Sequence, residues 1–266
     1  MNTPTTFADL ALDPSLQAGL DALDYTVLTP IQAQALPAVL EGRDLIAQAP
    51  TGSGKTAAFG LGLLQGIDAT AVRTQALVLC PTRELADQVG KQLRKLATGI
   101  ANLKLSVLCG GIPLGPQLAS LAHAPHVVVG TPGRVLELVQ KEALDLRKVR
   151  TLVLDEADRM LDMGFDEPIR ALVKRTPKDR QTLLFSATFP DTIRTLAKAM
   201  LREPLEVSVD GGAQPAAIRA HFFEVDAARR APQLAALLLQ FKPESTVVFC
   251  NMRRDTEEVV GSLAHY

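Results

Sequence analysis

Short apolar runs alternate with longer amphipathic segments along most of the chain. The apolar runs are bounded by turn residues, which is typical of strands, and they lie at 44–47, 76–80, 104–109, 126–129, 151–154, 181–185 and 205–209. Amphipathic segments such as 83–97 and 191–201 lie between them and predict helices. Strands that alternate with helices form a parallel sheet with helices on both faces. The pattern therefore predicts an α/β fold.

A linker is predicted near residue 210. Residues 210–217 read Asp-Gly-Gly-Ala-Gln-Pro-Ala-Ala, and small residues with proline are typical of a segment between domains. Beyond it the predicted elements follow in the order strand, helix, strand and helix, at 221–225, 229–240, 246–250 and from Arg253. About two strand and helix pairs cannot bury a sheet on both faces. We therefore expect 218–266 to be the start of a second domain that the chain does not complete.

The composition fits a soluble globular protein. The chain has 266 residues, of which 47% are hydrophobic and 21% are charged, enough for one sizeable core and the start of a second. Its 28 basic and 29 acidic side chains give a formal charge of -1. A nucleic acid would therefore have to be held by a local basic patch rather than by the field of the whole protein. Only 4% of the residues are aromatic, which argues against a surface built for stacking on bases.

Cysteine usage and the lack of targeting signals predict a cytoplasmic protein. Cys80, Cys109 and Cys250 are odd in number and widely spaced, so we expect neither a disulfide framework nor a zinc site. Residues 1–13 lack both a positive flank and an apolar stretch, and no run of about eighteen apolar residues occurs. We expect no export signal, no membrane span and no membrane partner.

A glycine-rich segment follows the first predicted strand. Residues 49–56 read Ala-Pro-Thr-Gly-Ser-Gly-Lys-Thr, the pattern of a phosphate-binding loop except that Ala49 takes the place of its first glycine. Backbone N–H groups of such a loop wrap the phosphates, Lys55 can reach the β and γ phosphates, and the Thr56 hydroxyl can ligate Mg²⁺. The helix that begins there adds its positive N-terminal end. A glycine-rich structural turn is the alternative, but a buried turn has no need of the lysine.

Acidic residues follow a second buried strand. The string Asp-Glu-Ala-Asp comes directly after 151–154, so Asp155 lies at the carboxyl end of that strand, where open α/β sheets bind their ligands. Phosphoryl transfer needs a metal anchor and a group that orients the attacking water. Asp155 can supply the first and Glu156 the second. An acidic turn that caps a helix is the alternative, which the phosphate loop makes the weaker one. We therefore predict hydrolysis of a nucleoside triphosphate, with Lys55, Asp155 and Glu156 as catalytic residues.

The chain resembles the DEAD-box RNA helicases over nearly its whole length, through motifs that occur in the order of that family. The motifs are Asp-Tyr-Thr-Val-Leu-Thr-Pro-Ile-Gln at 24–32, the phosphate loop at 49–56, Pro-Thr-Arg-Glu-Leu at 81–85, Gly-Gly at 110–111, Thr-Pro-Gly-Arg at 131–134, Asp-Glu-Ala-Asp at 155–158, Ser-Ala-Thr at 186–188 and Val-Val-Phe-Cys-Asn at 247–251. The strings at 56–64 and 158–165 are similar to the bacterial DbpA type, a branch associated with ribosomal RNA. The resemblance implies a Q-motif region at 1–33 and a RecA-like ATP-binding domain at 34–209, before the linker and an incomplete second RecA-like domain.

The resemblance implies that ATP and Mg²⁺ are the cofactors. It implies that Gln32 recognises adenine, since its amide can pair with the adenine amine and N7, that Tyr25 stacks on the base, and that Phe7 closes the pocket. Plain packing is the alternative for both aromatic residues. Thr56 would hold Mg²⁺, as would Asp155 through the water shell of the ion. The nucleotide-binding set is Phe7, Tyr25, Gln32, Ala49, Thr51, Gly52, Ser53, Gly54, Lys55 and Thr56.

The resemblance also implies a sequence-independent grip on RNA phosphates by the loops that follow strands. N–H groups, hydroxyls and an arginine can bind phosphates there. For the glycine pair, the alternative is a tight turn. For Thr-Pro-Gly-Arg, the alternative is a helix that starts with proline. The nucleotide state and the RNA state would be coupled through Asp158, Ser186 and Thr188. The RNA-binding set is Pro81, Thr82, Arg83, Gly110, Gly111, Thr131, Pro132, Gly133 and Arg134.

Two positions depart from the family pattern, and one part of the pattern is missing. Asp24 stands where the family commonly has glycine, and Pro50 lies inside the phosphate loop, so either could change loop geometry. The arginines by which the second domain of the family completes the ATP site do not follow Asn251. We therefore expect the chain by itself to bind ATP weakly and not to unwind a duplex.

The sequence thus predicts an ATP-dependent RNA helicase in which ATP hydrolysis drives local duplex unwinding, with ribosomal RNA or a pre-ribosomal particle as partner. A non-catalytic module that binds ATP and RNA is the alternative, and ATP turnover with and without RNA distinguishes the two. A metabolic P-loop kinase or a DNA motor is disfavoured by the Q motif and the Ser-Ala-Thr string.

Overall fold

The structure is a computed structural model that describes residues 4–209, 219–226 and 229–264. The chain divides into two compact units, Met1–Gly212 and Ala213–Tyr266, called here the first and the second unit. The linker predicted at 210–217 lies outside the described residues.

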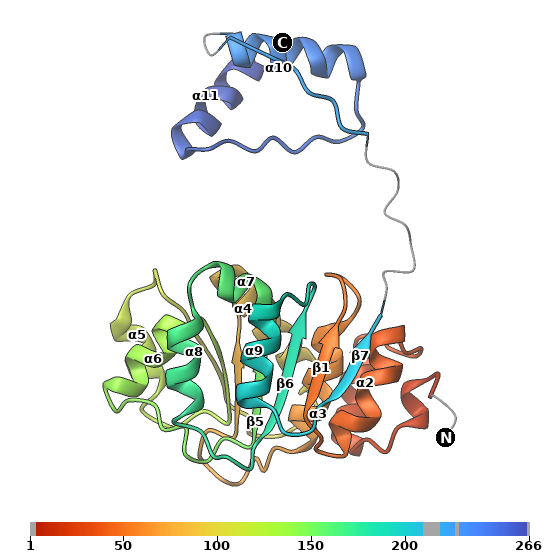
Figure 1. Ribbon diagram of the computed structural model, residues 1–266, viewed down its shortest axis with the longest axis vertical. Coiled ribbons are helices and arrows are strands. Elements are labelled where there is room, and N and C mark those ends of the chain that lie inside the picture. Colours follow the sequence, from red (N-terminus) through yellow and green to blue (C-terminus); the bar gives the residue numbers. More distant parts are fainter. Residues whose placement is uncertain (1–3, 210–218, 227–228, 265–266) are drawn as a thin grey trace. The chain divides into compact units, whose positions relative to one another are not determined.

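Seven parallel strands form the sheet of the first unit (Figure 1). The strands are β1 (Leu45–Gln48), β2 (Ala76–Leu79), β3 (Leu105–Leu108), β4 (Val127–Gly130), β5 (Thr151–Leu154), β6 (Gln181–Ser186) and β7 (Leu205–Ser208). Their order across the sheet is β3-β4-β2-β5-β6-β1-β7. Parallel neighbours need crossover connections, and helices supply them here. The predicted α/β fold is therefore confirmed, and every strand predicted in this unit is present with ends that differ by at most one residue.

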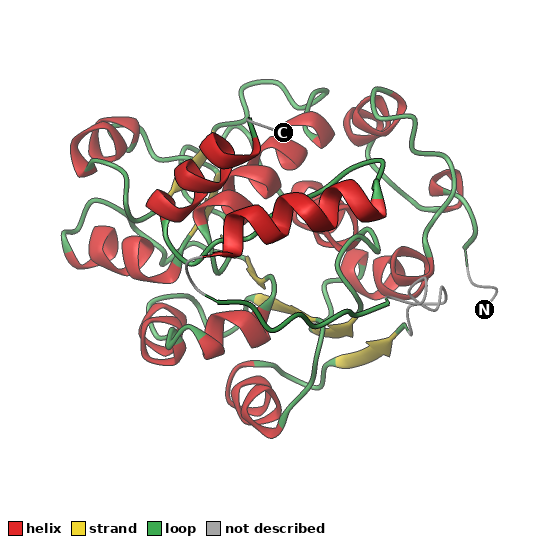
Figure 2. Cartoon of the chain, turned by 90° about the horizontal axis from the view of Figure 1, so that it is seen from above, coloured by secondary structure: helices red, strands yellow, loops and turns green. Residues whose placement is uncertain are grey.

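Helices cover both faces of this sheet, as the view from above shows (Figure 2). The elements are η1 (Phe7–Asp9), α1 (Pro14–Asp21), α2 (Pro30–Leu40), α3 (Lys55–Gln65), α4 (Arg83–Leu96), α5 (Leu114–Ser120), α6 (Pro132–Gln140), α7 (Ala157–Asp162), α8 (Asp166–Val173) and α9 (Asp191–Met200). None of the helices in the described part of the chain has the length and hydropathy of a membrane span.

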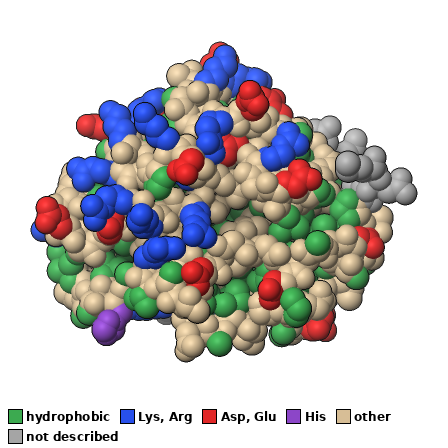
Figure 3. Space-filling view, turned by 90° about the horizontal axis from the view of Figure 1, so that it is seen from below, with side chains coloured by type: hydrophobic (Ala, Val, Ile, Leu, Met, Phe, Trp, Pro, Cys, Tyr) green, Lys and Arg blue, Asp and Glu red, His purple; other side chains and the backbone are tan. Residues whose placement is uncertain are grey.

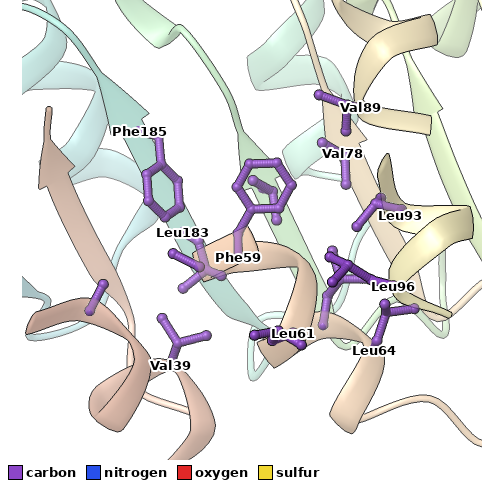
Figure 4. Close-up of a cluster of buried hydrophobic side chains, with 14 of the residues drawn as sticks. Val39, Phe59, Leu61, Leu64, Val78, Val89, Leu93, Leu96, Leu183 and Phe185 are labelled. Carbon is purple, nitrogen blue, oxygen red and sulfur yellow. The ribbon is translucent and has the colours of Figure 1, made fainter. Parts of the chain in front are cut away.

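The strands read as continuous apolar runs because both of their faces are buried. Successive side chains point to opposite faces, so Leu45 and Ala47 pack with helices α1 to α4, whereas Ile46 packs with helices α6 to α9. In the first of these two cores, the rings of Phe59 in α3 and Phe185 in β6 meet with centroids 5.4 Å apart (Figure 4). These cores fix the strand ends, from which the site loops begin.

Helices α2 and α3 pack closely at a glycine. A Cβ atom on Gly62 of α3 would lie 2.0 Å from Cγ1 of Val39 in α2, so only glycine fits at this crossing without a shift. The contact sets the distance between the two helices, and their N-terminal ends carry Gln32 and Lys55. It therefore places the base-recognition segment beside the phosphate loop.

The second unit consists of two helices and extended segments in its described residues. Helix α10 (Arg230–Phe241) packs on helix α11 (Arg253–Leu263), and Ala235 is the one buried hydrophobic residue among those that the structure describes in this unit. The strands predicted at 221–225 and 246–250 are wrong, because neither segment forms a ladder. A parallel strand needs a neighbour for its N–H and C=O groups, and within these described residues there is none. Phe222 and Phe249 are accordingly 95% and 93% exposed.

Candidate functional site

The predicted site residues gather at one edge of the sheet, called here the carboxyl edge because every strand ends there. The predicted phosphate loop follows β1, Asp155 and Glu156 follow β5, and the predicted coupling residues lie at β6, three strands that are neighbours in the order β5-β6-β1. Phe7, Tyr25 and Gln32, which are also predicted to bind nucleotide, precede β1. Those predicted to bind RNA follow β2, β3 and β4, which are neighbours in the order β3-β4-β2. One half of the edge thus holds the nucleotide candidates and the other half holds the RNA candidates. Ligands bind at this edge of open α/β sheets.

The phosphate loop leads from β1 into α3. The Ala49 N–H donates to the Ser186 carbonyl at 3.0 Å, which anchors the start of the loop on β6. Gly52 and Gly54 have φ of 82° and 95°, the left-handed region that favours glycine. Lys55 is 7% exposed, and its Nζ donates to the Ala49 carbonyl at 3.1 Å. The ammonium therefore lies across the loop at the start of a helix, where phosphates bind. Pro50 is accommodated, because its carbonyl accepts from the Ser53 N–H at 3.4 Å.

The Gln32 amide connects α2 to this loop. Its Oε1 accepts from the Thr29 N–H at 2.9 Å, and its Nε2 donates to the Gly54 carbonyl at 3.1 Å. An amide has two N–H donors and two acceptor lone pairs, so one of each remains for a ligand. That is the pair that an adenine amine and N7 require. Adenine recognition by Gln32 stays a prediction, with a fixed orientation of the amide in its favour.

Tyr25 and Phe7 stack on each other. Their ring centroids are 5.9 Å apart with 17° between the planes, and the Tyr25 hydroxyl accepts from Nε2 of Gln92 at 3.2 Å. Phe7 is only 2% exposed, which favours packing over a direct ligand contact for this residue. Asp24, which precedes Tyr25, has φ of 54°. This left-handed position explains why glycine suits it, and Asp is among the few other residues that adopt it readily.

Asp155 is the buried carboxylate of the carboxyl edge. It follows β5 directly, is 3% exposed, and its N–H donates to the Leu79 carbonyl at 2.9 Å. Burial raises the pKa of Asp155 to about 6, while the Lys55 ammonium opposes this rise and Glu156 reinforces it. Oδ1 of Asp155 is buried and has no hydrogen-bond partner among the described residues. A buried oxygen of this kind is costly unless a cation or a cation-bound water contacts it.

These groups fit Mg²⁺ that arrives with a nucleotide. Mg²⁺ keeps several waters and usually takes one or two carboxylates together with substrate phosphates. In the described part of the chain, no group of three His, Cys, Asp or Glu residues could hold a metal alone. Thr56 adds a hydroxyl in the first turn of α3, and the Ser53 hydroxyl is buried there without a partner that the structure describes. The donor set therefore suits a metal and nucleotide complex.

Glu156 lies in a different environment from Asp155. Its φ of 53° and ψ of 54° place it in the left-handed region just before α7. For a residue other than glycine this conformation costs on the order of 1–3 kcal/mol, and such strain clusters at functional sites. The side chain is 16% exposed, with Oε2 at 3.8 Å from Nη1 of Arg159. Unlike Asp155, Glu156 can therefore contact a water molecule.

Asp158, Ser186 and Thr188, the predicted coupling residues, are joined by hydrogen bonds. Oδ2 of Asp158 accepts from the Thr188 N–H at 2.9 Å and from its hydroxyl at 2.7 Å, and the Asp158 N–H donates to Oγ of Ser186 at 3.3 Å. Burial favours a higher pKa for Asp158, but these hydrogen bonds outweigh burial and hold the pKa below its usual value. The bonds connect α7 to the end of β6, so a shift of one element acts on the other.

The RNA candidates lie on adjacent loops but differ in accessibility. Thr82 caps α4, since its Oγ1 accepts from the Leu85 N–H at 3.2 Å. The exposed Arg83 pairs with Glu84, at 3.2 Å, and lies against Gly111, whose φ of 72° favours glycine. The Thr131 hydroxyl accepts from the Gly110 N–H at 3.2 Å and so ties two of the loops together. Pro81 and Pro132 are buried behind these loops, and Gly133 is exposed.

Arg134 is held inside the protein instead of facing solvent. Nη1 and Nη2 both donate to the Ile112 carbonyl at 3.1 Å, Nε lies 3.0 Å from Oε2 of Glu137, and the side chain is 11% exposed. In this conformation Arg134 supports the glycine loop, and a contact with an RNA phosphate would require its release.

A model of the DEAD/DEAH box helicase family matches residues 29–196. The chain belongs to this family. It is 50% identical over 260 residues to the ATP-dependent RNA helicase DbpA of Escherichia coli (strain K12), an alignment that covers 97% of the chain and 57% of that relative. It is 41% identical to the DEAD-box ATP-dependent RNA helicase CshA of Bacillus cereus (strain ATCC 10987 / NRS 248), with 97% and 49% covered. The chain therefore spans about half the length of the curated relatives it matches.

A solved structure of the same family supports the fold. The crystal structure of a DEAD box protein from the hyperthermophile Methanococcus jannaschii is similar with a TM-score of 0.75 and 35% identity, over 98% of this chain and 70% of that one. The resemblance to DEAD-box helicases predicted from the motifs is confirmed, as is the RecA-like α/β class.

One residue that supports the loops of the RNA candidates was not predicted. Gln117 in α5 is 6% exposed, its Oε1 accepts from the Cys109 N–H at 3.0 Å, and its Nε2 donates to the Cys109 carbonyl at 3.0 Å. Both ends of the amide thus hold the backbone next to Gly110. Only a polar residue among the apolar positions of α5 hints at this role in the sequence.

Proposed function

We propose that this chain is the nucleotide-binding part of an ATP-dependent RNA helicase that uses ATP with Mg²⁺ to unwind RNA duplexes locally. Membership of the DEAD/DEAH box family and the names of the relatives support the proposal. The observation that carries it is the buried Oδ1 of Asp155, which has no hydrogen-bond partner among the residues that the structure describes. Asp155 follows a strand two positions from that of the phosphate loop, and the Lys55 ammonium acts electrostatically on its carboxylate.

Each side chain at the carboxyl edge has a separate task in this proposal. Lys55 balances the charge of the β and γ phosphates, and the N-terminal end of α3 contributes its backbone N–H groups. Asp155 and Thr56 hold Mg²⁺, which neutralises phosphate charge when bound. Glu156, the carboxylate in contact with solvent, orients the attacking water and accepts its proton. Gln32 selects adenine.

The RNA loops supply phosphate contacts without reading bases. Exposed groups at these loops are Arg83, Gly111 and Gly133, and the hydrogen bond between Gly110 and Thr131 fixes two of the loops relative to each other. Phosphate contacts position a nucleic acid but carry no sequence information. The network of Asp158, Ser186 and Thr188 lies in the nucleotide half, where it joins α7 to the end of β6, and in this proposal it couples the nucleotide state to the RNA state. Closure of a second RecA-like domain on ATP and RNA would complete the site with arginines.

Ribosomal RNA or a pre-ribosomal particle is the proposed partner, and the cytoplasm is the proposed location. The identity to DbpA and the strings at 56–64 and 158–165 support the partner, and the three widely spaced free cysteines, Cys80, Cys109 and Cys250, support the location.

The test is ATP turnover in a protein in which this chain is continued by a complete second RecA-like domain. RNA should stimulate hydrolysis, and Glu156→Gln should lower turnover at least about a hundredfold while nucleotide binding is retained. Glu167→Gln, an exposed glutamate of α8, is the matched control and should hydrolyse ATP like the parent. Undiminished hydrolysis by Glu156→Gln would move the general base elsewhere, and an absence of turnover in the parent would favour a non-catalytic module.

A further inference from the structure

A basic groove lies at the opposite edge of the sheet, where the strands begin. Its volume is about 650 Å³, and basic side chains gather on this face (Figure 3). We call it the amino-edge groove, defined by its basic lining residues Arg73, Arg147, Lys148, Arg150 and Arg180. A single carboxylate, that of Asp179, belongs to the described lining. The chain as a whole has a formal charge of -1, so this concentration of positive charge is local.

The sheet brings these residues together from three distant segments. The Arg150 N–H donates to the Gln75 carbonyl at 2.7 Å, and the Gln181 N–H donates to the Arg150 carbonyl at 2.8 Å. These bonds align the segments that precede β2, β5 and β6, which are neighbours in the sheet. Arg73, Arg150 and Arg180 therefore line one groove from backbone segments that the sheet holds in register.

The cations are only partly neutralised within the protein. Arg147 forms a bidentate pair with Asp145, with Nη2 at 2.8 Å from Oδ2. Lys148 and Arg150 are exposed and form no ion pair with a residue that the structure describes. Arg180 is 7% exposed, with Nη1 donating to the Pro177 carbonyl at 2.8 Å, while its Nε is buried without a described partner. Buried cationic donors without acceptors are costly, so this surface favours an anion.

The buried Arg180 remains charged in this setting. Burial lowers its pKa, Arg202 adds to that effect, and the buried Asp44 carboxylate opposes it. A guanidinium begins from a pKa far above neutrality, so it stays protonated at neutral pH. The groove therefore presents permanent positive charge.

We propose that the amino-edge groove binds the phosphate backbone of double-helical RNA, as a second RNA contact remote from the helicase motifs. The choice of RNA as the anion rests on the proposed function. None of the described residues that line the groove is aromatic, whereas single-stranded nucleic acids are usually held by stacking on aromatic rings. An A-form duplex is recognised largely through its phosphates and hydroxyls. An acidic peptide would also need apolar contacts with the groove. Val149 of the lining is buried and cannot supply one.

The test is the affinity of the 266-residue chain for a short blunt-ended RNA duplex with a fluorescent label, measured by anisotropy across about 50 to 200 mM salt. The double variant Lys148→Gln/Arg150→Gln should bind about tenfold more weakly at low salt, and its log-log salt slope should fall by about two. The control Lys91→Gln/Lys95→Gln removes the same charge from exposed positions of α4 and should bind the duplex like the parent. ATP affinity should be the same in all three proteins.

The possible outcomes separate the two proposals. If the parent binds no RNA of any kind, the RNA function itself is overturned. If the parent binds the duplex but both double variants bind equally well, only the groove is overturned. Combining Arg83→Gln with the groove variant should give additive losses in log affinity, since independent contacts add. A polyglutamate peptide that competes as well as duplex RNA at equal charge would show an unselective anion surface and would overturn the assignment to RNA.

Discussion

The two edges of the same sheet carry charge in different ways. At the carboxyl edge, Lys55 and Asp155 are buried, each in a fixed place at the end of its own loop or strand. At the amino edge, Lys148 and Arg150 are exposed neighbours of three further cations. At the carboxyl edge each group is irreplaceable, because a buried charge has no neighbour that can substitute for it. At the amino edge binding is distributed over several similar cations. Single substitutions should therefore have large effects at one edge and small effects at the other.

The largest effect is expected for Lys55→Ala at the carboxyl edge. The ammonium lies across the phosphate loop, and water cannot replace a point charge held against the β and γ phosphates. ATP affinity should fall by at least about a hundredfold, which corresponds to about 2.7 kcal/mol. Titration calorimetry of the 266-residue chain measures this directly.

Lys141→Ala is the matched control for this change. Lys141 is exposed just after α6 and should bind ATP like the parent. An affinity of Lys55→Ala within twofold of the parent would remove the main support for a nucleotide site.

Asp44 is a buried charged residue at the amino edge, and Asp44→Ala should destabilise the fold. Asp44 is 4% exposed, and its carboxylate accepts from the Thr182 N–H at 2.8 Å and from the Arg202 N–H at 2.7 Å. Leaving these buried donors unsatisfied should cost about 2–3 kcal/mol, seen as a lower urea midpoint. Asp44→Asn keeps one acceptor and should lose about half as much. A loss for Asp44→Ala below about 0.5 kcal/mol would show that the donors find other partners.

Gln32→Ala tests whether the connection between α2 and the phosphate loop also reads the base. Guanine presents a carbonyl where adenine presents an amine, so loss of the amide should reduce the preference for ATP over GTP by about tenfold. GTP affinity is the internal control, measured by competition of the two nucleotides. Base recognition predicts a loss for ATP alone. Equal losses for ATP and GTP would leave Gln32 only as the support of Gly54.

What could be predicted from sequence depends on whether the residues that act together are also close together along the chain. The phosphate loop and Asp155 were predictable because a nucleotide site needs particular residues next to a strand end, and such residues follow the strand directly in the sequence. The held position of Arg134 was not, because the carbonyl that it contacts belongs to Ile112 on another loop. The amino-edge groove was not either, since Arg73, Arg150 and Arg180 meet only through the register of three strands.

The second unit shows a further limit of pattern reading. The run at 246–250 has the same apolar character as the strands of the first unit, yet it forms no ladder. Apolar periodicity measures what a segment could bury, whereas a strand also requires a partner for its backbone. Phe249 is exposed for that reason.

The smallest effect is expected for Arg150→Gln alone, and this variant tests the difference between the two edges most directly. If the amino-edge groove binds by summed charge, removing one of its five cations should weaken duplex RNA binding by less than about fivefold and lower the salt slope by about one. Arg150→Lys keeps the charge but not the fork of a guanidinium, so it should bind like the parent. The measurement is anisotropy with the same RNA duplex over the same salt range. Arg150→Gln could instead lower the affinity more than about a hundredfold, with no rescue by Arg150→Lys. Arg150 would then make a specific bidentate contact with the RNA. A single residue would be irreplaceable at the amino edge too, and the difference between the edges would fail.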